Sequence, residues 1–225
     1  SGKNWSKAIR SLEKLLITRE KIEIVSETDR HLFAVCKDGR VLPTEASVIT
    51  DSDGDIIEFF LAEKAVEKAE IEQIIANVGL ERGLEEIRSR FHSPTSPTES
   101  AIEAIKNADV VIYGSGTFYS SILPTLQIED ISNVIAENPN PKIMILNIVE
   151  EADTRGFLGI DLVEKIAGFV GKDSISHIAV NTPNIEKVGA YFTLNEDELN
   201  EKGFKVEIIK GDFESRTRPG RHDAM

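Results

Sequence analysis

The stretch that decides the fold lies at residues 109–121 and reads Asp-Val-Val-Ile-Tyr-Gly-Ser-Gly-Thr-Phe-Tyr-Ser-Ser. Residues 109–113 are typical of a strand buried on both faces, because apolar side chains follow one another without polar alternation. Residues 114–121 then supply two glycines and four serine or threonine hydroxyls, and we expect a helix to begin among them. Strand, glycine-containing turn and helix in this order predict one unit of an α/β fold.

The same pattern recurs along the C-terminal half of the chain. Apolar runs at 142–147, 175–180 and 205–209 each follow a stretch with helical spacing. Residues 96–99 read Ser-Pro-Thr-Glu, which predicts a helix start with Ser96 as the N-cap. We therefore predict a Rossmann-like, mostly parallel sheet with helical crossovers.

The N-terminal half has a different organisation. Residues 5–16 carry apolar side chains at helical spacing and predict an amphipathic helix with one buried face. Short β-rich runs are expected at 22–25, 31–36, 40–49 and 56–60, with an Asp-Gly hairpin turn inside residues 37–40. Residues 61–90 are typical of a charged helical stretch that breaks near Gly79 or Gly83.

These patterns divide the chain into three predicted parts. Residues 1–19 form an N-terminal helix on the main domain, and residues 20–90 form a small β-hairpin and helical appendage. Residues 91–225 form the Rossmann-like α/β domain, in which we expect a nucleotide or phosphate to bind.

Composition limits the classes of function. The 225 residues are 40% hydrophobic and 29% charged, which is the composition of a globular protein and excludes disorder of the whole chain. Lys and Arg number 26 against 39 Asp and Glu, a net charge of −13, which repels nucleic acid and anionic membrane. Any phosphate ligand must therefore be held by local groups.

Cysteine content and hydropathy favour a cytoplasmic protein. The single cysteine, Cys36, lies in an apolar run and can form no internal disulfide, which fits a reducing compartment. The uncharged run at 110–128 has the length of a membrane span, but glycines, hydroxyl residues and a proline interrupt it. We expect neither a membrane span nor a signal peptide.

Candidate binding residues follow the predicted parallel strands, because ligands of open α/β sheets collect at the carboxyl ends of the strands. The first loop offers free amides, hydroxyls and a helix N-terminus, a combination that holds phosphate without a lysine. We expect its Gly114, Ser115, Gly116, Thr117, Ser120 and Ser121 to cradle a phosphate, and Asn147, Asp153 and Asn181 to line the crevice. The alternative is a tight strand-to-helix turn in which the hydroxyls only cap the helix.

Other chemistry has less support in the sequence. The loop has no Walker-type lysine, and Tyr119 stands where a dinucleotide fingerprint has its third glycine. The four histidines have no spacing that pairs them on a helix for a metal, and we assign no catalytic residue. Residues 216–223 concentrate positive charge, so they either meet a phosphate by folding back or form a frayed terminus.

Three motifs resemble one known superfamily. Residues 113–124, Tyr-Gly-Ser-Gly-Thr-Phe-Tyr-Ser-Ser-Ile-Leu-Pro, are similar to a Gly-Pro-Gly-Ser-Leu-Tyr-Thr-Ser-Ile-Ile-Pro run of 2-phospho-L-lactate transferases and gluconeogenesis-factor-like proteins. Residues 153–157, Asp-Thr-Arg-Gly-Phe, resemble that superfamily's Glu-Thr-Asp-Gly-Tyr, and residues 221–223 resemble its Arg-His-Asp. The resemblance covers most of residues 5–225.

Within this superfamily, residues 117–121 look more like the gluconeogenesis-factor branch. That resemblance implies binding of a UDP-sugar such as UDP-N-acetylglucosamine and a regulatory role in carbon metabolism, the cell envelope and cell shape. The alternative is transfer of a phospholactyl group from a guanosine diphosphate donor to a deazaflavin in coenzyme F420 synthesis. Mg²⁺ is expected only for that transferase, and we expect no other cofactor.

One departure from the superfamily pattern bears on the site. Its glycine-rich first strand and its Asp-Asp-Gly-Gly segment are absent from these 225 residues. We therefore expect either the C-terminal part of a longer protein or a shortened relative. A third hypothesis is an interaction module that uses residues 61–90, and the oligomeric state stays open, a homo-oligomer included.

Overall fold

The structure is a computed structural model, and it describes residues 5–16, 21–182 and 191–223. Its centre is a parallel sheet, as predicted, and the strand order is β4-β5-β6-β7. The strands are β4 (Val111–Tyr113), β5 (Lys142–Ile145), β6 (His177–Asn181) and β7 (Glu207–Gly211). Together with a small antiparallel sheet, this confirms the predicted α/β class, whereas the division at residues 19 and 90 stays a prediction.

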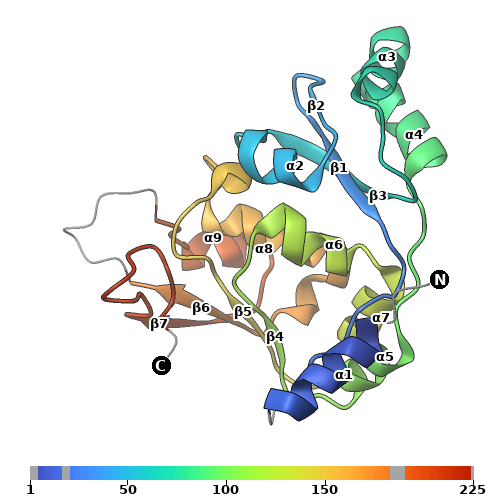
Figure 1. Cartoon of the computed structure of the whole chain (residues 1–225). Coiled ribbons are helices and arrows are strands. Elements are labelled where there is room, and N and C mark those ends of the chain that lie inside the picture. Colours follow the sequence, from blue (N-terminus) through green and yellow to red (C-terminus); the bar gives the residue numbers. More distant parts are fainter. Residues whose placement is uncertain (1–4, 17–20, 183–190, 224–225) are drawn as a thin grey trace.

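Helices connect the parallel strands and form a layer against one face of the sheet (Figure 1). The elements around this layer are α5 (Glu99–Lys106), the π-helix η1 (Phe118–Ile122), α6 (Leu123–Leu126), α7 (Glu129–Glu137), the 3₁₀ turns η2 (Ala152–Thr154) and η3 (Lys172–Ser174), α8 (Gly159–Val170) and α9 (Glu196–Glu201). Helix α5 begins two residues later than predicted. Its N-cap is Thr98, whose hydroxyl accepts a hydrogen bond from the Ala101 amide at 3.2 Å, and not Ser96.

The antiparallel sheet has strand order β2-β1-β3 and consists of β1 (His31–Cys36), β2 (Val41–Leu42) and β3 (Ile56–Ala62). Gly39 in the turn between β1 and β2 has φ +81°, as the Asp-Gly signal requires. One expected β-rich run is wrong, and the run expected at 40–49 is correct only at β2. Residues 22–25 form no strand. Strand β2 ends at Leu42, and helix α2 (Glu45–Asp51) follows because Thr44 and Ser47 form a capping box at its N-terminus.

The charged stretch at 61–90 contains two helices. These are α3 (Lys68–Val78) and α4 (Leu80–Phe91), and they part at Gly79, where φ is +83°. The predicted break therefore lies at Gly79 and not at Gly83, which continues α4. Helix α3 packs on α4, and both stand beside the small sheet at the upper right of Figure 1.

The small sheet is buried on both faces. One face, with Leu32, Ala34 and Phe59, belongs to the main core that reaches down to the parallel sheet. The other face, with Phe33 and Phe60, packs in a separate cluster with α3 and α4. Strand alternation accounts for the two clusters, because neighbouring residues of β1 point to opposite faces.

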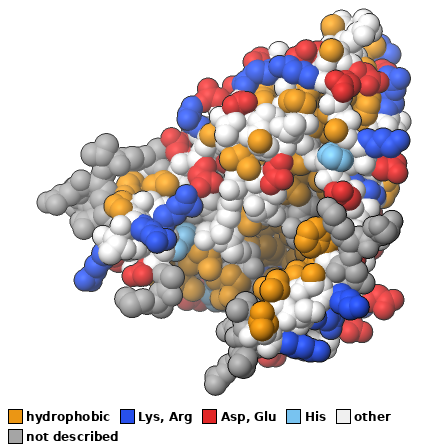
Figure 2. Space-filling model, in the orientation of Figure 1, with side chains coloured by type: hydrophobic (Ala, Val, Ile, Leu, Met, Phe, Trp, Pro, Cys, Tyr) orange, Lys and Arg blue, Asp and Glu red, His pale blue; other side chains and the backbone are white. Residues whose placement is uncertain are grey.

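The parallel sheet is buried on one face. Tyr113, Met144 and Ile178 point into the main core, whereas Ile112 and Ile209 on the opposite face are 56% and 39% exposed. Apolar side chains are visible over these strands in Figure 2. The prediction of a first strand buried on both faces is therefore wrong. Strand β4 lies at the edge of the sheet, and its Ile112 lies on the face that is exposed to solvent.

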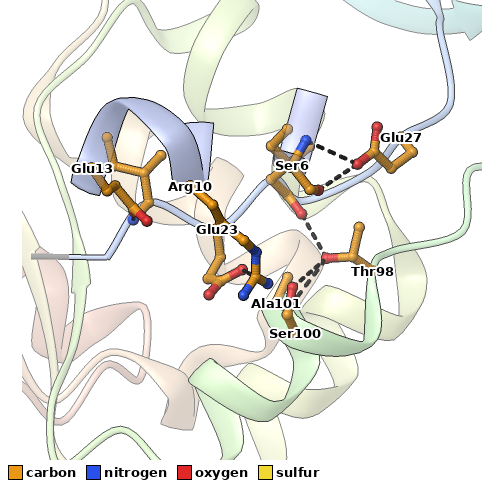
Figure 3. A network of polar contacts seen from close by, with 10 residues as sticks. Ser6, Arg10, Glu13, Glu23, Glu27, Thr98, Ser100 and Ala101 are labelled. Carbon is orange, nitrogen blue, oxygen red and sulfur yellow. Dashed lines mark hydrogen bonds and ion pairs between the residues drawn. The ribbon is translucent and has the colours of Figure 1, made fainter. Parts of the chain in front are cut away.

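Helix α1 (Trp5–Leu16) forms where predicted, but its apolar face is not buried. Trp5, Leu12 and Leu15 are 54%, 55% and 76% exposed. Polar contacts attach the helix instead (Figure 3), including a bond from the Ser6 amide to Glu27 and an ion pair between Arg10 and Glu23 at 3.7 Å.

A glycine turn fastens the small sheet to the segment that follows β5. The Gly54 amide donates to the Ala152 carbonyl at 2.9 Å, and Gly54 has φ +74°. A Cβ atom at Gly54 would lie 1.9 Å from the Arg155 carbonyl oxygen, so only glycine permits this approach.

Candidate functional site

A pocket of about 470 Å³ lies at the carboxyl ends of β4 and β5. Five predicted residues line it together: Ser115, Gly116, Thr117, Ser121 and Asn147. The remaining lining comes from Ile148, Val149 and Glu151 after β5, and from Gly220, Arg221 and His222 near the C-terminus. Two strand-end loops and the C-terminal segment thus meet at the edge where α/β sheets bind ligands.

The loop after β4 presents unused hydrogen-bond donors to this pocket. Within the described part of the chain, no group accepts a hydrogen bond from the amides of Ser115, Gly116 or Thr117. The loop is fixed from the next strand, since the Asn147 side-chain amide donates to the Gly116 carbonyl at 3.1 Å. An anion with several acceptor oxygens fits such a set of amides and hydroxyls.

Asp153 does not line this pocket. It is 1% exposed, and its Oδ2 accepts a hydrogen bond from the Tyr119 amide at 2.9 Å, at the start of η1. Burial raises the pKa of Asp153, while hydrogen bonds from the Tyr119 and Phe118 amides oppose the rise. Asp153 therefore accepts the hydrogen bond that the Tyr119 amide, at the N-terminus of η1, would otherwise offer to a ligand. The sequence-based expectation that the N-terminal amides of this helix face a ligand does not hold for Tyr119.

Three other predicted residues also lie outside the pocket lining. Gly114 is exposed, and Ser120 lies within η1. Asn181 is 5% exposed, and its Oδ1 accepts a bond from the Phe213 amide at 2.8 Å. Asn181 thereby attaches the C-terminal segment to the end of β6.

The basic C-terminal segment folds back on the sheet edge. Residues 214 and 222 form an antiparallel bridge, and the Ser215 amide donates to the Arg221 carbonyl at 2.7 Å. Glu214 is 4% exposed and accepts the Gly220 amide at 2.6 Å and the Tyr191 hydroxyl at 3.1 Å. Of the two sequence-based alternatives for this segment, the structure shows the folded one.

Sequence reasoning assigned no role to Glu214 or Gly220. A glutamate five residues before a Pro-Gly pair gives no local signal for a clamp, since its partners are brought together by folding. The Arg-His-Asp resemblance was the available signal for this part of the pocket.

Charge in the pocket is balanced locally. The Arg221 guanidinium lies 3.9 Å from the Glu151 carboxylate, and its side chain is 74% exposed. Burial lowers the pKa of His222, partly offset by a hydrogen bond with the Leu146 backbone, so its imidazole is neutral at pH 7. Figure 2 shows Lys and Arg side chains gathered over the C-terminal loop, next to the largely white surface of the neighbouring loops.

The described residues do not fit a metal site. No group of three or more His, Cys, Asp or Glu side chains comes together within them in a way that could hold an ion. Glu151 and His222 alone supply too few ligands for a protein-held cation.

A larger hollow, of about 590 Å³, lies between α5 and α7. Its acidic lining includes Glu99, Glu103, Asp130 and Glu137, with Lys106 as the cation. This charge disfavours a phosphate ligand. Among the helices that the structure describes, none has the length and apolar character needed to cross a bilayer.

Comparison with known families gives one match over nearly the whole chain. A family model described as "2-phospho-L-lactate transferase CofD" matches residues 1–213. A "Gluconeogenesis factor" of Listeria monocytogenes is 34% identical over 122 residues, 52% of this chain and 38% of the relative. A "Putative gluconeogenesis factor" of Thermotoga maritima is 25% identical over 99% of this chain and 64% of its own length.

Solved structures agree on the fold. A member of the UPF0052 family from Bacillus halodurans superposes with a TM-score of 0.75 at 23% identity, covering 98% of this chain and 64% of that one. The chain thus spans between about four tenths and two thirds of the length of these relatives.

Proposed function

The chain belongs to the 2-phospho-L-lactate transferase CofD family, and from this premise we propose that it binds the diphosphate of a nucleotide-sugar in the pocket after β4 and β5. The ligand is of the UDP-N-acetylglucosamine type, and the role is regulatory, in carbon metabolism and the cell envelope. The relatives described as gluconeogenesis factors support this role over a catalytic one.

One observation carries the binding proposal. Residues 115–117, whose amides have no acceptor within the described part of the chain, line the same pocket as Arg221 from a distant part of the sequence. The loop amides and hydroxyls bind the diphosphate oxygens, and the Arg221 guanidinium adds a charge-assisted contact. At about 470 Å³ the pocket is within the usual size range of small-molecule sites.

A second candidate function is transfer of a phospholactyl group from a guanosine diphosphate donor. The description of the matching family favours it. In that case the same loop would bind the diphosphate of the donor, and Mg²⁺ would come with the nucleotide, because the described residues form no metal cluster.

Calorimetric titration distinguishes the two. We expect saturable binding of UDP-N-acetylglucosamine by the wild-type chain without added metal. Preference for GDP with Mg²⁺ would support the transferase, and binding of neither would contradict the proposed site.

A pair of glycine variants tests whether the loop is the site. Gly116 lines the pocket and a Cβ there would meet Ile122 Cδ1 at 3.4 Å, an ordinary contact, so Gly116→Val fills the pocket with little cost to folding. Gly114 lies outside the lining and has nothing within 4 Å of its Cβ position, which makes Gly114→Val the matched control. We expect at least tenfold weaker binding for Gly116→Val, about 1.4 kcal/mol, and no change for Gly114→Val. Equal affinity of folded Gly116→Val and wild type would remove the loop from the site.

A further inference from the structure

A second cavity, of about 260 Å³, lies on the other side of η1, between β3 and α8. Its apolar walls are Phe59, Tyr119, Leu123 and Phe169, and its polar groups include Gln127 and Lys165. The volume is slightly below that of drug-sized pockets, so it suits a body of about one ring. None of these residues lines the pocket assigned to the diphosphate.

Lys165 brings a positive charge to this cavity. Its Nζ lies 5.4 Å from the ring centroids of both Tyr119 and Phe157. Within the described part of the chain, the ammonium has neither a hydrogen bond nor an ion pair. Burial lowers the pKa of Lys165, Lys37 lowers it further, and Asp161 opposes both.

Gln127 lines the same cavity and carries an unused acceptor. Its Nε2 donates to the Phe59 carbonyl at 3.1 Å, which fixes the amide. Its Oε1 is buried and has no hydrogen-bond partner, an arrangement that is costly unless a donor arrives. Two residues that line one largely apolar cavity, Lys165 and Gln127, thus carry a cation and an acceptor that have no hydrogen-bond partner in the described part of the chain.

We propose that this cavity binds a small carboxylate with an apolar body and a hydroxyl or amino group, its carboxylate on Lys165 and its donor on Gln127. The aromatic walls take the apolar body. A single ammonium suits a monoanionic carboxylate better than a phosphate, which needs several donors. Glu58 also lines the cavity, but Arg88 binds its carboxylate at 2.8 and 2.5 Å.

Three related probes test this chemistry by titration of the wild-type chain. 3-Phenyllactate carries the carboxylate, the hydroxyl and the ring, and we expect it to bind saturably. 3-Phenylpropionate lacks the hydroxyl and should bind several-fold more weakly, and 3-phenylpropane-1,2-diol lacks the carboxylate and should bind at least tenfold more weakly. Absence of saturable binding of 3-phenyllactate overturns the proposal.

Two substitutions assign the contacts. Lys165→Met keeps the apolar stem, removes the charge and should weaken 3-phenyllactate at least tenfold. The control is Lys172→Met, because Lys172 also lies over an aromatic ring, 5.2 Å from the Phe204 centroid, but outside the cavity. Gln127→Leu should make 3-phenyllactate and 3-phenylpropionate bind alike. Unchanged affinity in folded Lys165→Met would mean that Lys165 only packs over the rings.

Chemical labelling of the wild-type chain decides the matter if Lys165→Met fails to fold. Acetic anhydride acylates an unprotonated lysine amine and releases acetate. Bound 3-phenyllactate should reduce acylation of Lys165 several-fold and leave Lys172 unchanged, as read by mass spectrometry. Equal labelling of Lys165 with and without saturating probe overturns the proposal. The proposal does not rest on nucleotide binding, so either can fail alone.

Discussion

The two sheets differ in how they are covered. The antiparallel sheet is short, yet both of its faces are buried, against the main core and against α3 and α4. The parallel sheet is the larger, yet Ile112 and Ile209 remain exposed on one face. Parallel sheets are usually covered on both faces, so the exposure of one face of this parallel sheet is unusual. We infer that the small sheet supports the fold and that the carboxyl edge of the parallel sheet is free to serve binding.

The largest expected effect is in the covered sheet. Phe33 is fully buried, with its ring 4.9 Å from that of Phe60. Phe33→Ala should lower the free energy of unfolding by about 3–5 kcal/mol, measured by urea denaturation, because it leaves a cavity. Ile209→Ala, on the exposed face of the parallel sheet, is the control and should change stability by under about 1 kcal/mol. Similar losses for the two variants would contradict the comparison.

A smaller effect is expected where the C-terminal segment joins the parallel sheet. Glu214→Ala leaves the Gly220 amide without its acceptor and should cost about 1–3 kcal/mol. We expect faster tryptic cleavage at Arg216 and Arg221 and weaker binding of UDP-N-acetylglucosamine. The exposed Glu207→Ala on β7 should show neither effect. An unchanged cleavage rate in Glu214→Ala would mean that other contacts hold the segment.

The next prediction concerns binding without loss of stability. Arg221→Ala should weaken UDP-N-acetylglucosamine about three- to tenfold, or about 0.7–1.4 kcal/mol, with a smaller loss at high salt because Arg221 is exposed. Arg218 is exposed and lies outside the pocket lining, so Arg218→Ala serves as the matched control. Equal affinities of the two variants would exclude Arg221 from the ligand contacts.

The smallest expected effect is a pH dependence from His222. Burial lowers its pKa in the folded state below the ordinary 6.5, so the unfolded chain takes up the proton first. The stability that neutral His222 contributes is present above pH 6.5 and is lost as the pH falls through the folded-state pKa. Urea denaturation between pH 8 and 5 should show wild type losing stability relative to His222→Gln on acidification. A constant difference across this range would contradict the assignment.

The sequence predicted the elements that local patterns determine. The four parallel strands, the Asp-Gly hairpin and the break at Gly79 are all visible as apolar runs or turn residues. Coverage of the strands was not predictable, because the run at 109–113 is equally apolar whether one face or both are buried. The same holds for α1, whose spacing predicts an apolar face but not its exposure.

The candidate site was predictable in part. Residues 115–117, Ser121 and Asn147 meet at one pocket because parallel strands end at the same edge. Asp153 was misplaced, since a carboxylate after a strand can face the ligand or cap a neighbouring helix, and the choice depends on η1. The contacts of Glu214 with Tyr191 and Gly220 form on folding and left no local signal.

The contact at Gly54 has a consequence for how the molecule opens. The Gly54 amide bonds to Ala152, which stands between Glu151 of the pocket and Asp153 under η1. Separation of the small sheet from this segment must break that bond and expose the amide proton to solvent. Hydrogen exchange at this one amide therefore reports whether the two sheets open as a single cooperative unit: exchange as slow as global unfolding means that they do.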